Sequence, residues 1–95
     1  MKSPESVAAN IAAWTRRNAE YTDPSAARAW ASADMSWGKA GVPEAELDVL
    51  GDVKGLDVVE LGCGTAFGTA RLARLGARVV GVDPTPAQLE TARRM

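Results

Sequence analysis

The residues of this 95-residue chain that are best suited to chemistry lie at alternate positions in "VVELGCGTAFG", residues 58–68. They are Glu60, Gly62, Gly64 and Ala66. Glycines at the end of a strand let the backbone turn sharply, and they let a ligand approach the main chain because no Cβ intervenes. An acid-x-Gly-x-Gly-x-Ala pattern after an apolar run therefore indicates a loop that holds a ligand.

A second acid, Asp83, ends the next apolar run along the chain. A carboxylate in that place can accept two hydrogen bonds from a ribose diol. We expect a helix to start at about Thr65, so that its free N–H groups and positive dipole end point into the same space. Loop and acid together describe a nucleoside site at the carboxyl edge of a parallel sheet.

The loop departs from the dinucleotide fingerprint G-x-G-x-x-G, because the sixth position counted from Gly62 is Phe67. The last glycine of that fingerprint keeps the helix close to the strand while the loop wraps a pyrophosphate. Glu60 would also repel an anionic pyrophosphate, whereas it would attract a cationic amino-acid or sulfonium group. The residues thus favour a zwitterionic ligand with a positive charge over a nicotinamide or flavin dinucleotide.

Residues 55–95 predict the elements that must position this site. "LDVVELG" and "ARVVGVD" are dense in valine and leucine, which suits strands buried on both faces. Between them "TAFGTARLARLG" has helical apolar spacing and ends at Gly76. "TPAQLETARRM" predicts a further helix, for which Thr85 and Gln88 supply a capping box. The fold class is therefore α/β, with residues 55–95 as the first β-α-β-α portion of a mostly parallel sheet.

Residues 1–54 carry helical patterns and predict a helical cap or lead-in. A first helix is expected from Ser3 to about Asn18, because apolar residues recur at helical spacing from Val7 to Trp14.

A second helix is expected over residues 24–33, after the N-cap Asp23. "MSWGKAGVP" then reads as a loop, and "PEAELDVLG" as a short third helix that closes at Gly51.

Several side chains have a structural interpretation beside a functional one. Trp14 and Trp30 fall on apolar helix faces and are expected to pack, while for Trp37, in a glycine-containing loop, both packing and contact with the site stay open. Cys63 is expected to be a small loop residue and no nucleophile, because no basic neighbour in the sequence would lower its pKa. The solvated faces of two helices are expected to carry Arg71, Arg74, Arg93 and Arg94.

Charge and composition argue against several classes of partner. Eleven basic and twelve acidic residues give a net charge of −1, so the footprint expected for binding nucleic acid or an anionic membrane is absent. One cysteine and no histidine leave no internal disulfide and no zinc site. No apolar segment has the length of a membrane span or the form of a secretion signal, so we expect a cytoplasmic protein.

The stretch "VVELGCGTAFGTARLARLGARVVGVDPTPAQLETAR" resembles the first motif and its sequel in class I S-adenosylmethionine-dependent methyltransferases. The resemblance covers about residues 37–95 and extends only loosely over the first third of the chain. It implies a Rossmann-like three-layer sandwich and S-adenosylmethionine as cofactor. Ala66 departs from the family, which has a third glycine there; one added methyl group is a mild change if that residue is already helical.

In the family's terms, each candidate residue has a role. Glu60 would help to hold the methionine moiety, and the backbone of Gly62, Cys63 and Gly64 would line the cofactor. Asp83 would bind the ribose hydroxyls. Pro84 occupies a position that often packs against the adenine.

The resemblance implies no catalytic residue in this segment, because the groups that bind the acceptor come largely from later strands. We therefore interpret the chain as the N-terminal part of a methyltransferase for a small-molecule acceptor, with an unpaired sheet edge that could self-associate. The alternatives are a non-catalytic cofactor-binding or interaction module and, disfavoured by Phe67 and Glu60, an NAD(P)- or flavin-dependent oxidoreductase.

Overall fold

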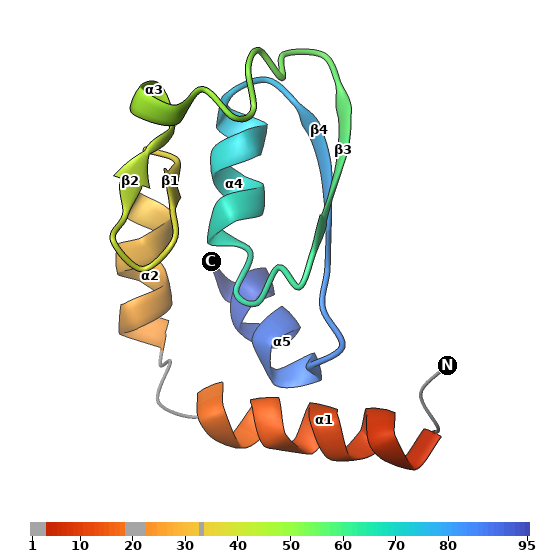
Figure 1. The fold of residues 1–95 in the computed structure, drawn as a ribbon. Coiled ribbons are helices and arrows are strands. Elements are labelled where there is room, and N and C mark those ends of the chain that lie inside the picture. Colours follow the sequence, from red (N-terminus) through yellow and green to blue (C-terminus); the bar gives the residue numbers. More distant parts are fainter. Residues whose placement is uncertain (1–3, 19–22, 33) are drawn as a thin grey trace.

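The computed structural model describes residues 4–18, 23–32 and 34–95 (Figure 1). The expected helix start at Ser3 and the expected helix end at Ala33 lie outside these ranges. The helices are α1 (Pro4–Arg17), α2 (Asp23–Ala31), α3 (Glu44–Leu47), α4 (Phe67–Arg74) and α5 (Pro86–Arg94). The strands are β1 (Ser36–Trp37), β2 (Val42–Pro43), β3 (Asp57–Leu61) and β4 (Arg78–Val82).

The strands β3 and β4 form a parallel pair, in which Asp57 lies opposite Arg78 and Leu61 opposite Val82. The predicted β-α-β unit is thereby confirmed, with α4 as its crossover helix. Figure 1 shows α4 between this sheet and α2, and α1 passing across the end of the molecule where α5 lies. Both strands consequently end near α5, on the side toward α1.

The core is small and lies on one side of this sheet. Val53, Leu72 and Ala77 are buried in it, and Val58 and Val79 of the strands pack against them. Burial on both faces was expected from the density of apolar residues in the strands, and that expectation is wrong for the described structure. Only the face toward α4 is covered.

The other face of the sheet carries apolar side chains that stay exposed. They are Val59, Leu61, Val80 and Val82, with relative exposures of 58%, 79%, 63% and 47%. The burial pattern alternates along each strand, because side chains of a strand point to opposite faces in turn and no described element covers the second face. The apolar sequence pattern is typical of a sheet with both faces buried, but the described residues bury only one face.

The segments before the sheet differ from expectation. The predicted loop at residues 35–43 contains the two-stranded antiparallel pair of β1 and β2. The third helix is a single turn, since Asp48 at its end adopts a left-handed conformation with φ of 47°. Glu44 explains why the turn stops there, because its carboxylate accepts hydrogen bonds from the backbone N–H groups of Val49 and Leu50, both at 2.9 Å.

Among the residues that the structure describes, no helix combines the length and the apolar composition needed to cross a membrane.

Candidate functional site

The loop between β3 and α4 turns through left-handed backbone conformations. Gly62 and Gly64 have φ values of 71° and 58°, which glycine adopts at little cost. The backbone N–H groups of Gly62 and Cys63 both donate to the carbonyl of Val82, at 2.7 and 3.0 Å. The loop is therefore fastened to the end of β4 while its glycines turn the chain toward α4.

Ala66 has a φ of 65° and a ψ of 24°, so it is left-handed and precedes the helix. The expectation that its methyl group is a mild change rested on a helical backbone there, and the structure corrects it. A left-handed conformation costs an L-residue roughly 1–2 kcal/mol. The helix itself begins at Phe67, later than the predicted start at Thr65.

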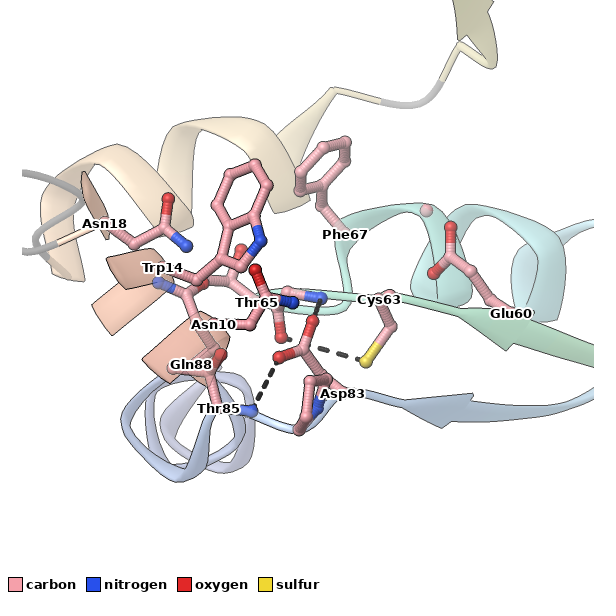
Figure 2. Close-up of a pocket in the computed structure, with 14 residues that line it drawn as sticks. Asn10, Trp14, Asn18, Glu60, Cys63, Thr65, Phe67, Asp83, Thr85 and Gln88 are labelled. Atoms are coloured by element: carbon pink, nitrogen blue, oxygen red, sulfur yellow. Dashed lines mark hydrogen bonds between the residues drawn. The ribbon is translucent and has the colours of Figure 1, made fainter. Parts of the chain in front are cut away.

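Asp83 joins the two loops at the carboxyl edge of the sheet. Its carboxylate accepts a hydrogen bond from the N–H of Gly64 to Oδ2 and another from the N–H of Thr85 to Oδ1, each at 2.9 Å (Figure 2). A carboxylate offers about four lone-pair sites, so acceptor capacity remains for a ligand. Thr85 makes no side-chain cap of α5, so the predicted capping box is wrong.

Glu60 lies against the start of α4. Its carboxylate accepts a 2.6 Å hydrogen bond from the hydroxyl of Thr69, and a Cβ added to Gly68 would lie 3.2 Å from its carboxyl carbon. Gly68 thus leaves room for the Glu60 carboxylate beside the start of α4. Sequence comparison with the dinucleotide fingerprint missed Gly68, because it stands one position later than Phe67.

The helix α2 is hydrogen-bonded both to the loop that follows β3 and to α4. The indole N–H of Trp30 donates to the carbonyl of Thr65 at 2.6 Å. Arg71, only 8% exposed, donates from Nε to the carbonyl of Ser32 and from Nη2 to that of Ala29, both at 3.0 Å. Arg71 was expected on a solvated face, which is wrong: its guanidinium bonds carbonyls at the C-terminal end of α2, where a cation is favoured.

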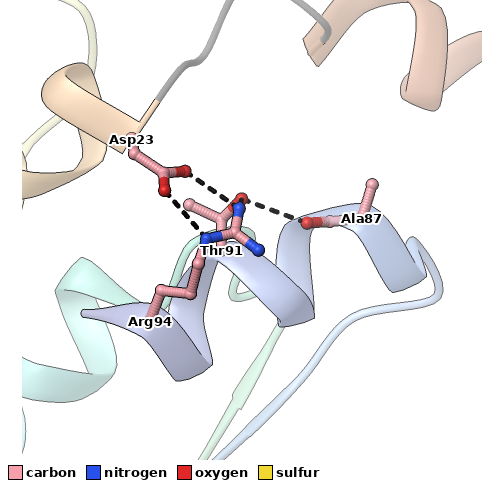
Figure 3. Close-up of polar contacts among 4 residues, drawn as sticks. All are labelled: Asp23, Ala87, Thr91 and Arg94. Atoms are coloured by element: carbon pink, nitrogen blue, oxygen red, sulfur yellow. Dashed lines mark hydrogen bonds and ion pairs between the residues drawn. The ribbon is translucent and has the colours of Figure 1, made fainter.

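A two-bond ion pair joins the start of α2 to the end of α5. Arg94 donates from Nε and Nη2 to the two carboxylate oxygens of Asp23 at 2.8 and 2.9 Å, and also from Nη2 to Thr91 at 3.0 Å (Figure 3). The hydrogen bond from Arg94 lowers the pKa of Asp23, outweighing partial desolvation. Arg94 is therefore a solvent-exposed residue, as expected, but one with a defined partner.

The β3–α4 loop, the β4–α5 loop, α5 and α1 line an open cavity of about 550 Å³ at the carboxyl edge of the sheet (Figure 2). All six predicted cofactor residues line it: Glu60, Gly62, Cys63, Gly64, Asp83 and Pro84. Its remaining wall is made by Asn10, Trp14, Asn18, Thr65, Phe67, Gly68, Thr85 and Gln88. The roles of the six within the cavity stay predictions.

The tryptophans are arranged differently from expectation. Trp14, expected to pack, lines the cavity, whereas Trp37 donates from its indole to Glu44 at 2.9 Å and is not among the lining residues. Asn10, Trp14 and Asn18, which lie within α1 and just past its end, stand at i, i+4 and i+8, and this spacing was present in the sequence. It was missed because two of them are asparagines, which an apolar pattern does not count.

Cys63 is a buried free thiol beside the glycine loop. Burial raises the pKa of this thiol, and the nearby charges of Asp83 and Glu60 raise it further. A raised pKa disfavours the thiolate, which is the nucleophilic form. The structure therefore supports the expectation that Cys63 is a loop residue.

Comparison with known proteins bears on the same part of the chain. Residues 58–95 match a family described as a methyltransferase domain. The ubiquinone biosynthesis O-methyltransferase of Methylocella silvestris is 48% identical over 42 residues, which are 44% of this chain and 16% of that protein. The demethylmenaquinone methyltransferase of Tropheryma whipplei is 37% identical over 60 residues, which are 63% of this chain and 23% of that protein.

A human relative extends the comparison. The mitochondrial ubiquinone biosynthesis O-methyltransferase of Homo sapiens is 41% identical over 39 residues, or 41% of this chain and 11% of that protein. The chain thus spans less than a quarter of the length of these curated relatives. No solved structure gives a significant match.

Proposed function

Because residues 58–95 match a methyltransferase-domain family, we propose that the chain belongs to the class I S-adenosylmethionine-dependent methyltransferases and supplies the cofactor-binding part of an enzyme that methylates a small molecule. The observation that carries this proposal is the bond between Asp83 and the N–H of Gly64. It brings the acid and the glycine loop, which are separate in the sequence, to one cavity.

The chemistry of the cavity fits a cationic adenosyl ligand. Two carboxylates line it, those of Glu60 and Asp83, and no lysine or arginine does among the described residues. A pyrophosphate would lack a cationic partner there and would meet two negative charges, whereas a sulfonium or ammonium group would be attracted. This charge pattern disfavours NAD(P) and flavin dinucleotides.

The backbone of the loop leaves room for such a ligand. A Cβ added at Gly62 would meet no atom within 4 Å, so the glycine borders open space. Side chains would fill that space if the residue were larger. We assign to Gly62, Cys63 and Gly64 the role of lining the cofactor with main chain, and to Pro84 a packing role beside the adenosine.

The role of this segment is alignment. S-Adenosylmethionine supplies the methyl group on a sulfonium, and transfer is an in-line displacement that depends on the relative placement of the reacting atoms. Glu60 would hold the amino-acid end, with its carboxylate oriented by Thr69. Asp83 would fix the ribose while tying the two loops together. No residue of this segment is assigned to proton transfer.

The relatives support a proposal for the kind of acceptor and for the complete fold. The names of these relatives concern ubiquinone and demethylmenaquinone, and we propose a small-molecule acceptor of similar size for this chain. We further propose that residues 55–95 open a Rossmann-like three-layer sandwich and that residues 1–54 form its helical lead-in. A buried free thiol fits the reducing cytoplasm.

A non-catalytic cofactor-binding module is the second candidate. The exposed sheet face of Val59, Leu61, Val80 and Val82 favours it, because a sheet of two strands with one bare face is an incomplete methyltransferase domain. Such a module would bind the adenosyl ligand and transfer no methyl group without a further polypeptide.

Calorimetric titration tests the proposal. The chain should bind S-adenosylmethionine and S-adenosylhomocysteine, and it should bind NAD much more weakly. Asp83→Ala should weaken S-adenosylhomocysteine at least tenfold, because two loops lose their common acceptor and the ribose loses its partner. Cys63→Ala should change the affinity little.

Two outcomes would contradict the assignment. Tighter binding of NAD than of S-adenosylhomocysteine would refute the cofactor. A larger loss of affinity in Cys63→Ala than in Asp83→Ala would refute the placement of the ribose.

A further inference from the structure

The helix α1 presents one polar and aromatic face to the cavity. Asn10, Trp14 and Asn18 follow one another at intervals of four residues from within α1 to just past its end, and all three line the cavity. None of the helix is buried in the core, and Trp14 is 46% exposed. Packing within the chain therefore does not account for this face.

The indole of Trp14 has one side already covered. The guanidinium of Arg17 lies 5.5 Å from the centre of the ring. Trp14 lines the cavity, whereas Arg17 does not. A planar ligand group can therefore stack on the indole from inside the cavity.

Amide side chains line the same cavity as this ring. They are those of Asn10 and Asn18, from α1 and just past its end, and that of Gln88 from α5. Each amide offers donors and an acceptor side by side, which is the arrangement that pairs with the N6 and N7 edge of adenine. Tryptophan is a stacking platform for nucleic bases. A neutral heteroaromatic ring with alternating donors and acceptors fits this combination.

The position of Trp14 and the amides in the cavity indicates which ring of the ligand they would contact. Figure 2 shows Trp14, Asn10, Thr85 and Gln88 grouped at the Asp83 end, with Glu60 at the far end. Asp83 is the residue to which the proposed function assigns the ribose. The base attached to that ribose would lie beside Asp83, away from the amino-acid end at Glu60.

We propose that α1 is the adenine-recognition element of this chain: Trp14 stacks on the base, and Asn10, Asn18 and Gln88 bond its edge. This proposal rests on the proposed function, since it requires an adenosyl ligand in the cavity. It adds a binding role for the N-terminal helix, which the match of residues 58–95 does not reach.

The test is titration of the full chain with S-adenosylhomocysteine. Trp14→Ala should weaken binding about tenfold or more, the range expected when a stacked base loses its platform. Trp14→Phe should retain most of the affinity, because phenylalanine also stacks. Trp37→Ala is the matched control, since Trp37 lies outside the cavity, and its affinity should equal that of the unsubstituted chain.

Two further readouts report on the base itself. Ligand binding should change the intrinsic fluorescence of the unsubstituted chain and of Trp37→Phe, and that change should be lost in Trp14→Phe. The inosine counterpart, S-inosylhomocysteine, carries a carbonyl in place of the amino group, so the chain should bind it less tightly. The double variant Asn10→Leu/Asn18→Leu should lose this discrimination.

The failures are distinguishable. If the unsubstituted chain binds no S-adenosylhomocysteine, both the proposed function and this inference fail. If it binds, and if Trp14→Ala keeps both its helical circular dichroism and its full affinity, only the inference is overturned. Unchanged discrimination against the inosine ligand in the double asparagine variant would overturn it as well.

Discussion

Ala66 shows how much the conformation of a single residue matters in this loop. Glycine is the residue that adopts its φ of 65° without strain, and the related motif has glycine in that place. The loop therefore carries a local strain that its two neighbouring glycines avoid. Strain of this kind is stored where a site holds the backbone in place.

Ala66→Gly should stabilise the chain by about 1 kcal/mol, the relief of the left-handed strain less the extra backbone freedom of glycine when unfolded. Urea unfolding would measure it. Ala73→Gly is the control, because Ala73 is exposed within α4 and the same substitution there should destabilise by roughly 1 kcal/mol. A loss of stability in Ala66→Gly would show that the left-handed conformation is not the one populated.

At the scale of elements, α2 acts on the cofactor loop although it contributes no residue to the cavity. Its Trp30 bonds the carbonyl of Thr65, and its C-terminal carbonyls bond Arg71 of α4. The loop is thereby held from two sides, by Val82 at its start and by Trp30 at its end. Preorganised loops lose less entropy when a ligand binds.

Trp30→Phe should remove the hydrogen bond to the Thr65 carbonyl while keeping an aromatic ring at this position. We expect a loss of about 1 kcal/mol in stability, the net value of one hydrogen bond, and a several-fold weaker binding of S-adenosylhomocysteine. Trp37→Phe also loses an indole hydrogen bond, the one to Glu44, and should show a similar loss of stability with unchanged affinity. Equal affinities in the two variants would show that α2 does not position the loop.

At the scale of the whole molecule, the bare face of the sheet is the main departure from a closed domain. Four apolar side chains are exposed on it, and only one strand neighbour exists for each of β3 and β4 in the described chain. Exposed apolar faces and open strand edges favour association. We propose that isolated chains self-associate through this face or edge.

Val80→Lys should reduce self-association, because a charge on the exposed face must be desolvated when two faces meet. Sedimentation equilibrium over a range of concentrations would measure the change. Val79→Lys is the contrasting variant, since Val79 points to the core and its substitution should unfold the chain. A concentration-independent monomer without substitution would contradict the proposal.

The sequence predicted those parts of the molecule that depend on neighbouring residues. The strands appear as dense apolar runs, and α4 and α5 appear as helical patterns. Glu60, Gly62 and Asp83 are found from their spacing within one β-α-β unit. Arg71 could not be placed in this way, because its partners Ser32 and Ala29 lie 39 and 42 positions away. Trp14 was misplaced because an apolar pattern does not count the asparagines that share its spacing. Ala66 was misjudged for a different reason: a composition pattern does not report the sign of φ.

The ties of α2 also set an order on how the chain can fold. The bond from Trp30 to Thr65 spans 35 positions, that from Arg71 to Ala29 spans 42, and that from Arg94 to Asp23 spans 71. Contacts between residues so far apart form only after long loops have closed, and loop closure slows folding. The helix α2 is therefore synthesised early, but its tertiary contacts form late. Its ion pair between Asp23 and Arg94 can form only after Arg94, at the end of α5, has left the ribosome.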